Sequence, residues 1–453
     1  MTTYLLLNTV NFDGVGDFVH FEEIVEELLR RPEFNDVRLV GFIYFFASDL
    51  EERYQDIQRR LDNLACRSDP ERFIYFYGRY QAHLSWRSDA SIASLFQEAS
   101  QLVIISYDKL TKLYEDLIPP RIVVKYIGEH EGVTGERLCR AERTLKRSMG
   151  LGPTCYGIKL KNIRPLTRKA AILTIQRLAP DFVASLSYST GITELANFFA
   201  RYELIPAYFN HLNAFFSFLS LFVSNSTLPQ NVIFYLSGVN LEHFLRHARH
   251  ENYFASCTDF QIEIIFQDHS IKLTPCSDDP SNRLIRVFCG FQIHTDAYYA
   301  LFRLTNIAGV SGDNSLELAI SMSVLPFYWS SNEECKRPTL TALREITQEN
   351  TVVSSKKARK SFGLYFNQVV LSQHEEIFEK QFSRAKHDLS TVNFKAMNKV
   401  WKDVTSYLKD HKNFYSHLTS IFIENVKTSA RDISIEESKL NDRSLLAMTT
   451  KTA

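Results

Sequence analysis

The sequence has no long apolar run and no excess of charge of either sign. Its most apolar stretch, residues 212–223, is shorter than the roughly 20 residues that a helix needs to span a bilayer. The 52 Lys and Arg residues equal the 52 Asp and Glu residues, so the chain lacks the basic excess typical of nucleic-acid-binding proteins. We therefore expect neither a membrane span nor a nucleic-acid partner.

Cysteine is also sparse. The seven cysteines are an odd number, lie far apart and form no Cys-x-x-Cys pair, which disfavours a disulfide framework and a cysteine-rich zinc site. Residues 1–14 have no basic stretch and only a short apolar run, so we expect no signal peptide. The expected location is the cytoplasm; the polar C-terminal end would also suit a bacterial effector that is secreted and acts in a host cell.

Several catalytic signatures are missing. The sequence has no GxxxxGK[ST] phosphate loop and no GxSxG nucleophile elbow. His243 and His247 have the spacing of the HExxH zinc motif but lack its glutamate. We expect no metal site and no resident cofactor.

The chain is long and rich in aromatic residues. Its 453 residues suggest two or three domains, and 45 % hydrophobic with 23 % charged residues is typical of globular proteins. Short apolar runs alternate with helical patterns in the first half, which predicts an α/β domain over residues 1–185 with a parallel sheet buried on both faces. We expect its strands at residues 4–10, 37–45, 73–77, 102–107 and 122–127.

The second half repeats this organisation. Helices are expected at 194–208 and around 215–221, followed by strands at 231–236, 261–266, 284–288 and 324–329. This pattern predicts a second Rossmann-like domain over 186–345. Residues 346–453 are expected to form a helical extension with a polar tail. In such a fold, ligands bind in the cleft between the domains, outside the carboxyl ends of the strands.

The turn after the first strand carries glycines and carboxylates. Gly14 and Gly16 allow a tight turn before a helix N-terminus. Asp13 and Asp17 would repel a dinucleotide pyrophosphate, and Val19 stands where GxGxxG has its last glycine, so NAD and FAD are disfavoured. Carboxylates at this place suit a general base or a sugar-hydroxyl ligand. Alternatively, Asp17 simply caps the following helix.

A second glycine turn has the sequence Gly312-Asp313-Asn314-Ser315. Its backbone amides and the Ser315 hydroxyl could hold a phosphate at the start of a helix. Glu317, one turn into that helix, could reach a ribose or sugar hydroxyl. The alternative is a core helix that Asp313 or Ser315 caps.

Two further segments follow strands and are expected at the cleft. Glu129 and His130 come directly after the fifth strand and are candidates for the acceptor side, with a solvated loop as the alternative. Phe291 and Gln292 follow a strand of the second domain, where an aromatic ring could stack on a nucleotide base. A core position is the alternative for Phe291.

The second turn resembles a motif of a known enzyme class. The stretch SGDNSLELAISMSVLPFYW is similar to the donor-binding segment of GT-B glycosyltransferases. More narrowly, Gly312-Asp313-Asn314-Ser315 is similar to the Gly-Glu-Asp-Ser motif of the bacterial protein-arginine rhamnosyltransferases. Asp313 replaces the Glu of that motif and Asn314 replaces its Asp.

The first turn carries the matching N-terminal motif. Asp13-x-x-Gly16-Asp17 is similar to the family's Asp-Asn-x-Gly-Asp, with Gly14 in place of Asn. A looser similarity links residues 126–130 and 150–152 to GT-B effectors of intracellular bacterial pathogens.

The resemblance implies a GT-B fold and transfer of a sugar from a nucleotide diphosphate sugar to a nucleophile, with a protein side chain as a candidate acceptor. It implies that Asp13 is the general base, that Asp17 and Asp313 position acceptor or donor, and that Asn314 and Ser315 hold the diphosphate. Glycosyl transfer without a metal needs such a base and amide donors at the leaving group, and the base suits inversion.

Two other functions fit the same pattern. A non-catalytic interaction protein could keep the double Rossmann fold as a scaffold, with the helical extension as its partner surface. A nucleotide-sugar epimerase would use the fold with no acceptor. Replacing Asp13 by Ala separates enzyme from scaffold, because only the enzyme would lose turnover while still binding its nucleotide.

Overall fold

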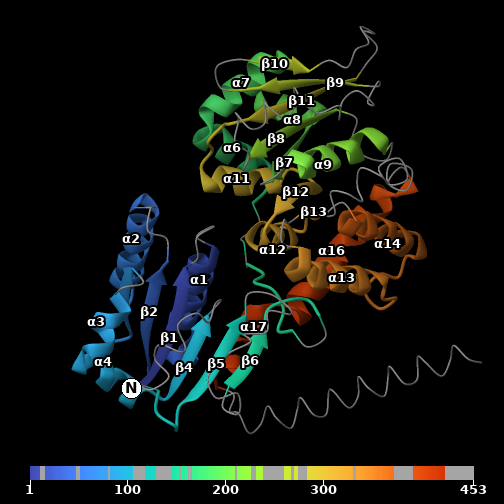
Figure 1. Ribbon diagram of the computed structural model, residues 1–453. Helices are drawn as coiled ribbons and strands as arrows, with labels where there is room; N and C mark the ends of the chain where they lie inside the picture. Colours follow the sequence, from blue (N-terminus) through green and yellow to red (C-terminus); the bar gives the residue numbers. More distant parts are fainter. Residues whose placement is uncertain are drawn as a thin grey trace, which may run out of the picture. The chain divides into compact units, whose positions relative to one another are not determined.

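Two largely parallel sheets organise the chain, each in its own compact unit (Figure 1). The first unit comprises residues 1–158 and 413–453, and the second comprises residues 159–412. The computed structural model describes residues 1–10, 16–46, 51–79, 82–105, 118–128, 144–152, 155–161, 163, 166–209, 212–225, 231–237, 260–266, 270–273, 283–329, 333–371 and 391–423.

The first unit contains a six-stranded parallel sheet with the order β3-β2-β1-β4-β5-β6. In its register, Leu5 of β1 pairs with Val40 of β2 on one side and with Leu102 of β4 on the other. The order reverses beside β1, as in Rossmann folds. The strands are β1 (Thr2–Val10), β2 (Val37–Phe45), β3 (Phe73–Arg79), β4 (Gln101–Ile105), β5 (Val123–Gly128) and β6 (Thr144–Ser148).

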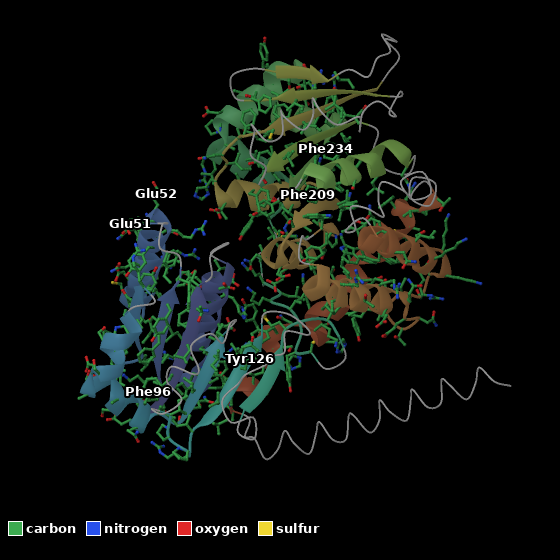
Figure 2. All side chains as sticks on the ribbon, in the orientation of Figure 1. Glu51, Glu52, Phe96, Tyr126, Phe209 and Phe234 are labelled. Carbon is green, nitrogen blue, oxygen red and sulfur yellow. The ribbon has the colours of Figure 1, made fainter. Side chains whose placement is uncertain are left out.

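Helices cover both faces of this sheet. Alternate side chains of β1 point to opposite faces, so Leu6 packs with α1 and α2 while Leu5 packs with α4. Phe96 of α4 and Tyr126 of β5 belong to this second core (Figure 2). The helices of this part are α1 (Gly16–Arg30), η1 (Pro32–Phe34), α2 (Glu51–Arg67), α3 (Ala82–Ser88) and α4 (Ala90–Glu98).

The last described helix, α17 (Phe414–Ile423), completes the core of the first unit. Its Phe414 and Leu418 are fully buried in the same cluster as α1. The Arg31 guanidinium donates a hydrogen bond to Thr419 Oγ1 at 2.8 Å. A segment from the far end of the chain therefore belongs to the first sheet.

The second unit contains a seven-stranded sheet with the order β10-β9-β11-β8-β7-β12-β13, in which only β10 runs antiparallel to its neighbour. In this sheet the strand order reverses between β7 and β12. The strands are β7 (Glu203–Tyr208), β8 (Val232–Ser237), β9 (Phe260–Ile265), β10 (Ser270–Leu273), β11 (Arg283–Cys289), β12 (Ile307–Ser311) and β13 (Leu325–Trp329).

Two helical layers pack on this sheet. One core joins β8 and β11 to α6, α7, α8 and α11, and contains Phe182 and Phe198. On α9, Phe215 and Phe218 pack against Phe234 of β8, which Figure 2 labels. The helices are α6 (Arg168–Leu178), α7 (Pro180–Thr190), α8 (Leu195–Arg201), α9 (Leu212–Ser224), α11 (Thr295–Phe302), α12 (Asp313–Ser321), α13 (Glu333–Gln348), α14 (Lys356–Leu371) and α16 (Phe394–His411).

The α/β fold class with two doubly wound sheets and C-terminal helices is confirmed. The division of the chain differs from the predicted boundaries at residues 185 and 345, because α6 and α7 pack in the second core and α17 packs in the first. The predicted polar tail after residue 423 lies outside the described residues. Among the described helices, none is long and apolar enough to cross a membrane.

One predicted element is wrong. The helix expected over 194–208 ends at Arg201, and the rest of that range is β7, the strand beside which the sheet order reverses. A short apolar run fits a buried strand as well as a buried helix. Pro206 was the available signal, because a proline inside a helix removes a hydrogen bond and clashes with the preceding turn.

Candidate functional site

The sheet topology itself indicates where each unit can hold a ligand. In open parallel sheets, a crevice forms outside the carboxyl ends of the two strands between which the order reverses. In the second unit these strands are β7 and β12, which pair at Ala207 and Gly309. A Cβ on Gly309 would lie 2.5 Å from the Phe209 ring, so this ring can pack on residue 309 only because that residue is a glycine.

The predicted Gly312 turn follows β12 directly and therefore lies at this crevice. Gly312 has φ 82° and ψ 162°, a backbone conformation that is essentially restricted to glycine. Helix α12 begins at the next residue, Asp313, so its first backbone N–H groups are at the carboxyl edge of the sheet. Such N–H groups, together with the helix dipole, favour an anion.

Two side chains of this turn form hydrogen bonds near the turn itself. The Ser315 hydroxyl donates to the carbonyls of Ser311 and Gly312 at 2.6 and 2.9 Å. Asp313 Oδ1 accepts from the Tyr328 hydroxyl at 3.2 Å. The Ser315 proton is thus used within the turn, and the donors that remain for a ligand are backbone N–H groups and the Asn314 side chain.

A buried lysine that sequence reasoning missed supports this turn. Lys159 Nζ lies 3.2 Å from Asn314 Oδ1 and 3.6 Å from Glu317 Oε2. The Lys159 backbone N–H also donates to Glu317 Oε1 at 2.9 Å. The side chains of Lys159 and Glu317 are 3 % and 2 % exposed, so Glu317 serves an internal ion pair here and does not face solvent.

The lysine also determines which way the Asn314 carboxamide points. An ammonium group only donates hydrogen bonds, so the oxygen of the carboxamide must face Lys159 and its NH₂ group must point away. Asn314 is an exposed residue. Its NH₂ group therefore adds a donor on the solvent side of the turn.

The other predicted residues of the second unit lie at the same edge but further along the sheet. Phe291 is 6 % exposed and packs against Phe182 with ring centroids 5.6 Å apart, so its ring is part of the core. Gln292 is exposed. Both follow β11, which is three strand spacings, or roughly 14 Å, from β12.

The crevice of the first unit lies between β1 and β4. Asn8 on β1, a second residue that sequence reasoning missed, bridges it: its Nδ2 donates to the carbonyls of Asp17 and Ile105 at 3.1 and 3.2 Å. Gly16 and Asp17 are the first two residues of α1, and Asp17 is 8 % exposed. A carboxylate in the first helical turn is favoured by the helix dipole.

Four of the predicted site residues, Asp13, Gly14, Glu129 and His130, lie outside the described residues. Their roles stay predictions. Within the described ranges, His, Cys, Asp and Glu form no group of three or more that could hold a metal ion.

No protein-family model matches the sequence, and no curated protein matches it. Solved structures show a distant similarity. HepE from Anabaena, in complex with UDP and glucose, is 11 % identical over 96 % of this chain and 100 % of its own, with a TM-score of 0.40. The α,α-trehalose 6-phosphate synthase from Burkholderia multivorans is 8 % identical, and the match covers 95 % of this chain and 99 % of the synthase, with a TM-score of 0.42. MurG from Acinetobacter baumannii is 9 % identical, and the match covers 90 % of this chain and 100 % of MurG, with a TM-score of 0.40.

Proposed function

We propose that this chain is a glycosyltransferase of GT-B architecture that transfers a sugar from a nucleotide diphosphate sugar to an acceptor. The observation that carries the proposal is the Gly312 turn, which opens a helix at the strand-order reversal of a doubly wound sheet. The first unit has a second reversal point of the same kind, with a carboxylate beside it.

The second unit would hold the donor. A diphosphate carries negative charge, and the turn offers backbone N–H groups and the Asn314 NH₂ group. Glu317 lies one turn away and would repel the diphosphate, but its charge is paired with Lys159. The exposed Gln292, further along the same edge, would contact the base or ribose.

The first unit would supply the carboxylates for the acceptor. In this proposal Asp13 takes the proton of the acceptor nucleophile, which attacks the anomeric carbon with inversion. The bond to the diphosphate breaks, and its electron pair leaves with the diphosphate. Helix N–H groups stabilise that charge without a metal. A protein side chain is the proposed acceptor, and Asp17 would position it.

Thermal shift of the full chain against GDP-, UDP-, dTDP- and CDP-sugars tests the donor site. A ligand that binds only the folded state raises the melting temperature by mass action. We expect a shift with one nucleotide that Asn314→Ala weakens and that Asn197→Ala, an exposed substitution on α8, leaves unchanged. The absence of any shift at millimolar concentrations would overturn the proposal and favour the scaffold alternative.

A further inference from the structure

The second unit has a cavity at the edge of its sheet opposite the Gly312 turn. The cavity has a volume of 370 Å³, near the lower end of the range for small-molecule sites. It lies at the amino ends of β7, β8 and β12. Its lining residues are polar for the most part, and those that carry charge or a carboxamide are Arg168, Arg201, Glu203, Asn231 and Asn306.

Glu203, the first residue of β7, is the single acidic group of this lining. Its Oε1 accepts hydrogen bonds from the Thr305 hydroxyl at 3.1 Å and the Asn306 backbone N–H at 3.3 Å. Within the described part of the chain, Oε2 has no hydrogen-bond partner. Burial raises the pKa of this carboxyl group, because the buried carboxylate is poorly solvated by water. A hydrogen-bond donor of a ligand would replace part of that missing solvation.

Two arginines line the same cavity, and the charge of one of them, Arg168, acts on the Glu203 carboxylate. Arg168 Nη2 donates to the Phe199 carbonyl at 2.7 Å, which holds the guanidinium at the wall of the cavity and leaves its other N–H groups for a ligand. Arg201, the last residue of α8, is exposed at the rim. The lining therefore combines two positive charges with one negative charge.

We propose that this cavity binds a small zwitterion of the amino-acid class. The ammonium group of the ligand donates to Glu203 Oε2, and its carboxylate binds the guanidinium groups of Arg168 and Arg201. A simple anion would meet the Glu203 carboxylate, and a simple cation would meet the two arginines, so neither uses the whole lining. This site is independent of the proposed nucleotide site.

The test measures the melting temperature of the full chain with each standard amino acid at about 10 mM, followed by calorimetry on those that raise it. We expect at least one amino acid to bind, and its N-acetyl and amide derivatives, which lack one of the two charges, to lose the effect. Glu203→Gln and Arg201→Gln should each weaken the dissociation constant by about tenfold or more. Arg201 is exposed, so its variant tests the site independently of any change in the core around Glu203.

The matched controls are Glu194→Gln and Arg177→Gln, two exposed substitutions in the same unit that should bind like the unmodified chain. The proposal is overturned when no amino acid raises the melting temperature. It is also overturned when the N-acetyl derivative binds as well as the amino acid, which would indicate an anion site, or when the two cavity variants bind like the controls.

Discussion

The two units reverse their strand order in the same way, but the groups at the two reversal points differ in chemical kind. In the first unit, Asn8 on β1 holds the start of α1, where Asp17 carries a carboxylate. In the second unit, Gly312 and Asn314 present N–H donors at the start of α12. The fold thus determines where a ligand can bind, and the residues of the turn determine which charge it can carry.

The supports of the two turns differ as well. Asn8 ties the first turn to β4 through neutral hydrogen bonds. The second turn rests on the buried ion pair of Lys159 and Glu317. A buried ion pair becomes costly when one partner is lost, so the second turn should be the more sensitive to substitution.

The largest effect is expected for Lys159→Met, which leaves the Glu317 carboxylate buried without its ion-pair partner. The free energy of unfolding should fall by about 3–5 kcal/mol. Urea denaturation followed by tryptophan fluorescence measures it, because two of the three tryptophans, Trp329 and Trp401, lie in the second unit. Nucleotide binding should also weaken, since the Asn314 carboxamide loses the group that orients it.

Lys360→Met is the control for that substitution, because Lys360 is exposed on α14 of the same unit. It should change stability by no more than about 0.5 kcal/mol. The double variant Lys159→Met/Glu317→Gln, which removes the charge and keeps the acceptor of the residue 159 backbone N–H, should recover most of the lost stability. An equal decrease in the free energy of unfolding for Lys159→Met and Lys360→Met would show that the ion pair does not support the second turn.

Gly312→Ala is expected to have the next largest effect. Alanine is strained at φ 82° and ψ 162°, at a cost of about 1–3 kcal/mol, and the shifted backbone should lose nucleotide binding. Gly363→Ala on α14 is the control: its Cβ would meet the Gln348 side chain at 3.5 Å, an ordinary contact. That variant should be as stable as the unmodified chain or more so, because alanine favours helices. Similar melting temperatures for both variants would contradict the role of the turn.

Asp17→Asn tests the first reversal point. Asparagine keeps the shape of the side chain and removes its charge, so turnover should fall by about tenfold or more while nucleotide affinity stays unchanged. Asn314→Ala should do the reverse and weaken nucleotide affinity. Release of nucleoside diphosphate measures turnover, with Asp36→Asn, an exposed substitution before β2, as control. Loss of nucleotide affinity in Asp17→Asn would remove the distinction between the two turns.

The smallest effect concerns Glu203, at the opposite edge of the second sheet. Burial raises the pKa of this carboxyl group above its ordinary value of 4.5, so the folded state holds the proton more tightly than the unfolded state. Stability then falls as the pH rises from 4.5 through the folded-state pKa. Glu203→Gln should therefore melt slightly higher than the unmodified chain at pH 7, and this difference should vanish below pH 4.5. A pH series of melting curves checks this, with Glu194→Gln expected to show no such trend.

Much of the fold could be predicted from local pattern. Residues 37–45 are apolar at nearly every position, and β2 has these bounds. Phe18, Phe21, Val25 and Leu28 recur at helical spacing, and all four are fully buried on α1. Strand β7 was predicted as helix, because a short apolar run fits a helix and a strand equally well, and β6, β10 and β12 were not predicted.

The sequence by itself determined the alternation of strands and helices and the glycine turn at Gly312, because both depend on neighbours within a few residues. Only the tertiary structure decided that β12 lies beside β7, that α17 joins the first core, and that Lys159 pairs with Glu317. Lys159 and Glu317 are 158 positions apart. Such partners meet through the topology of the sheet, and no local periodicity in the sequence marks them.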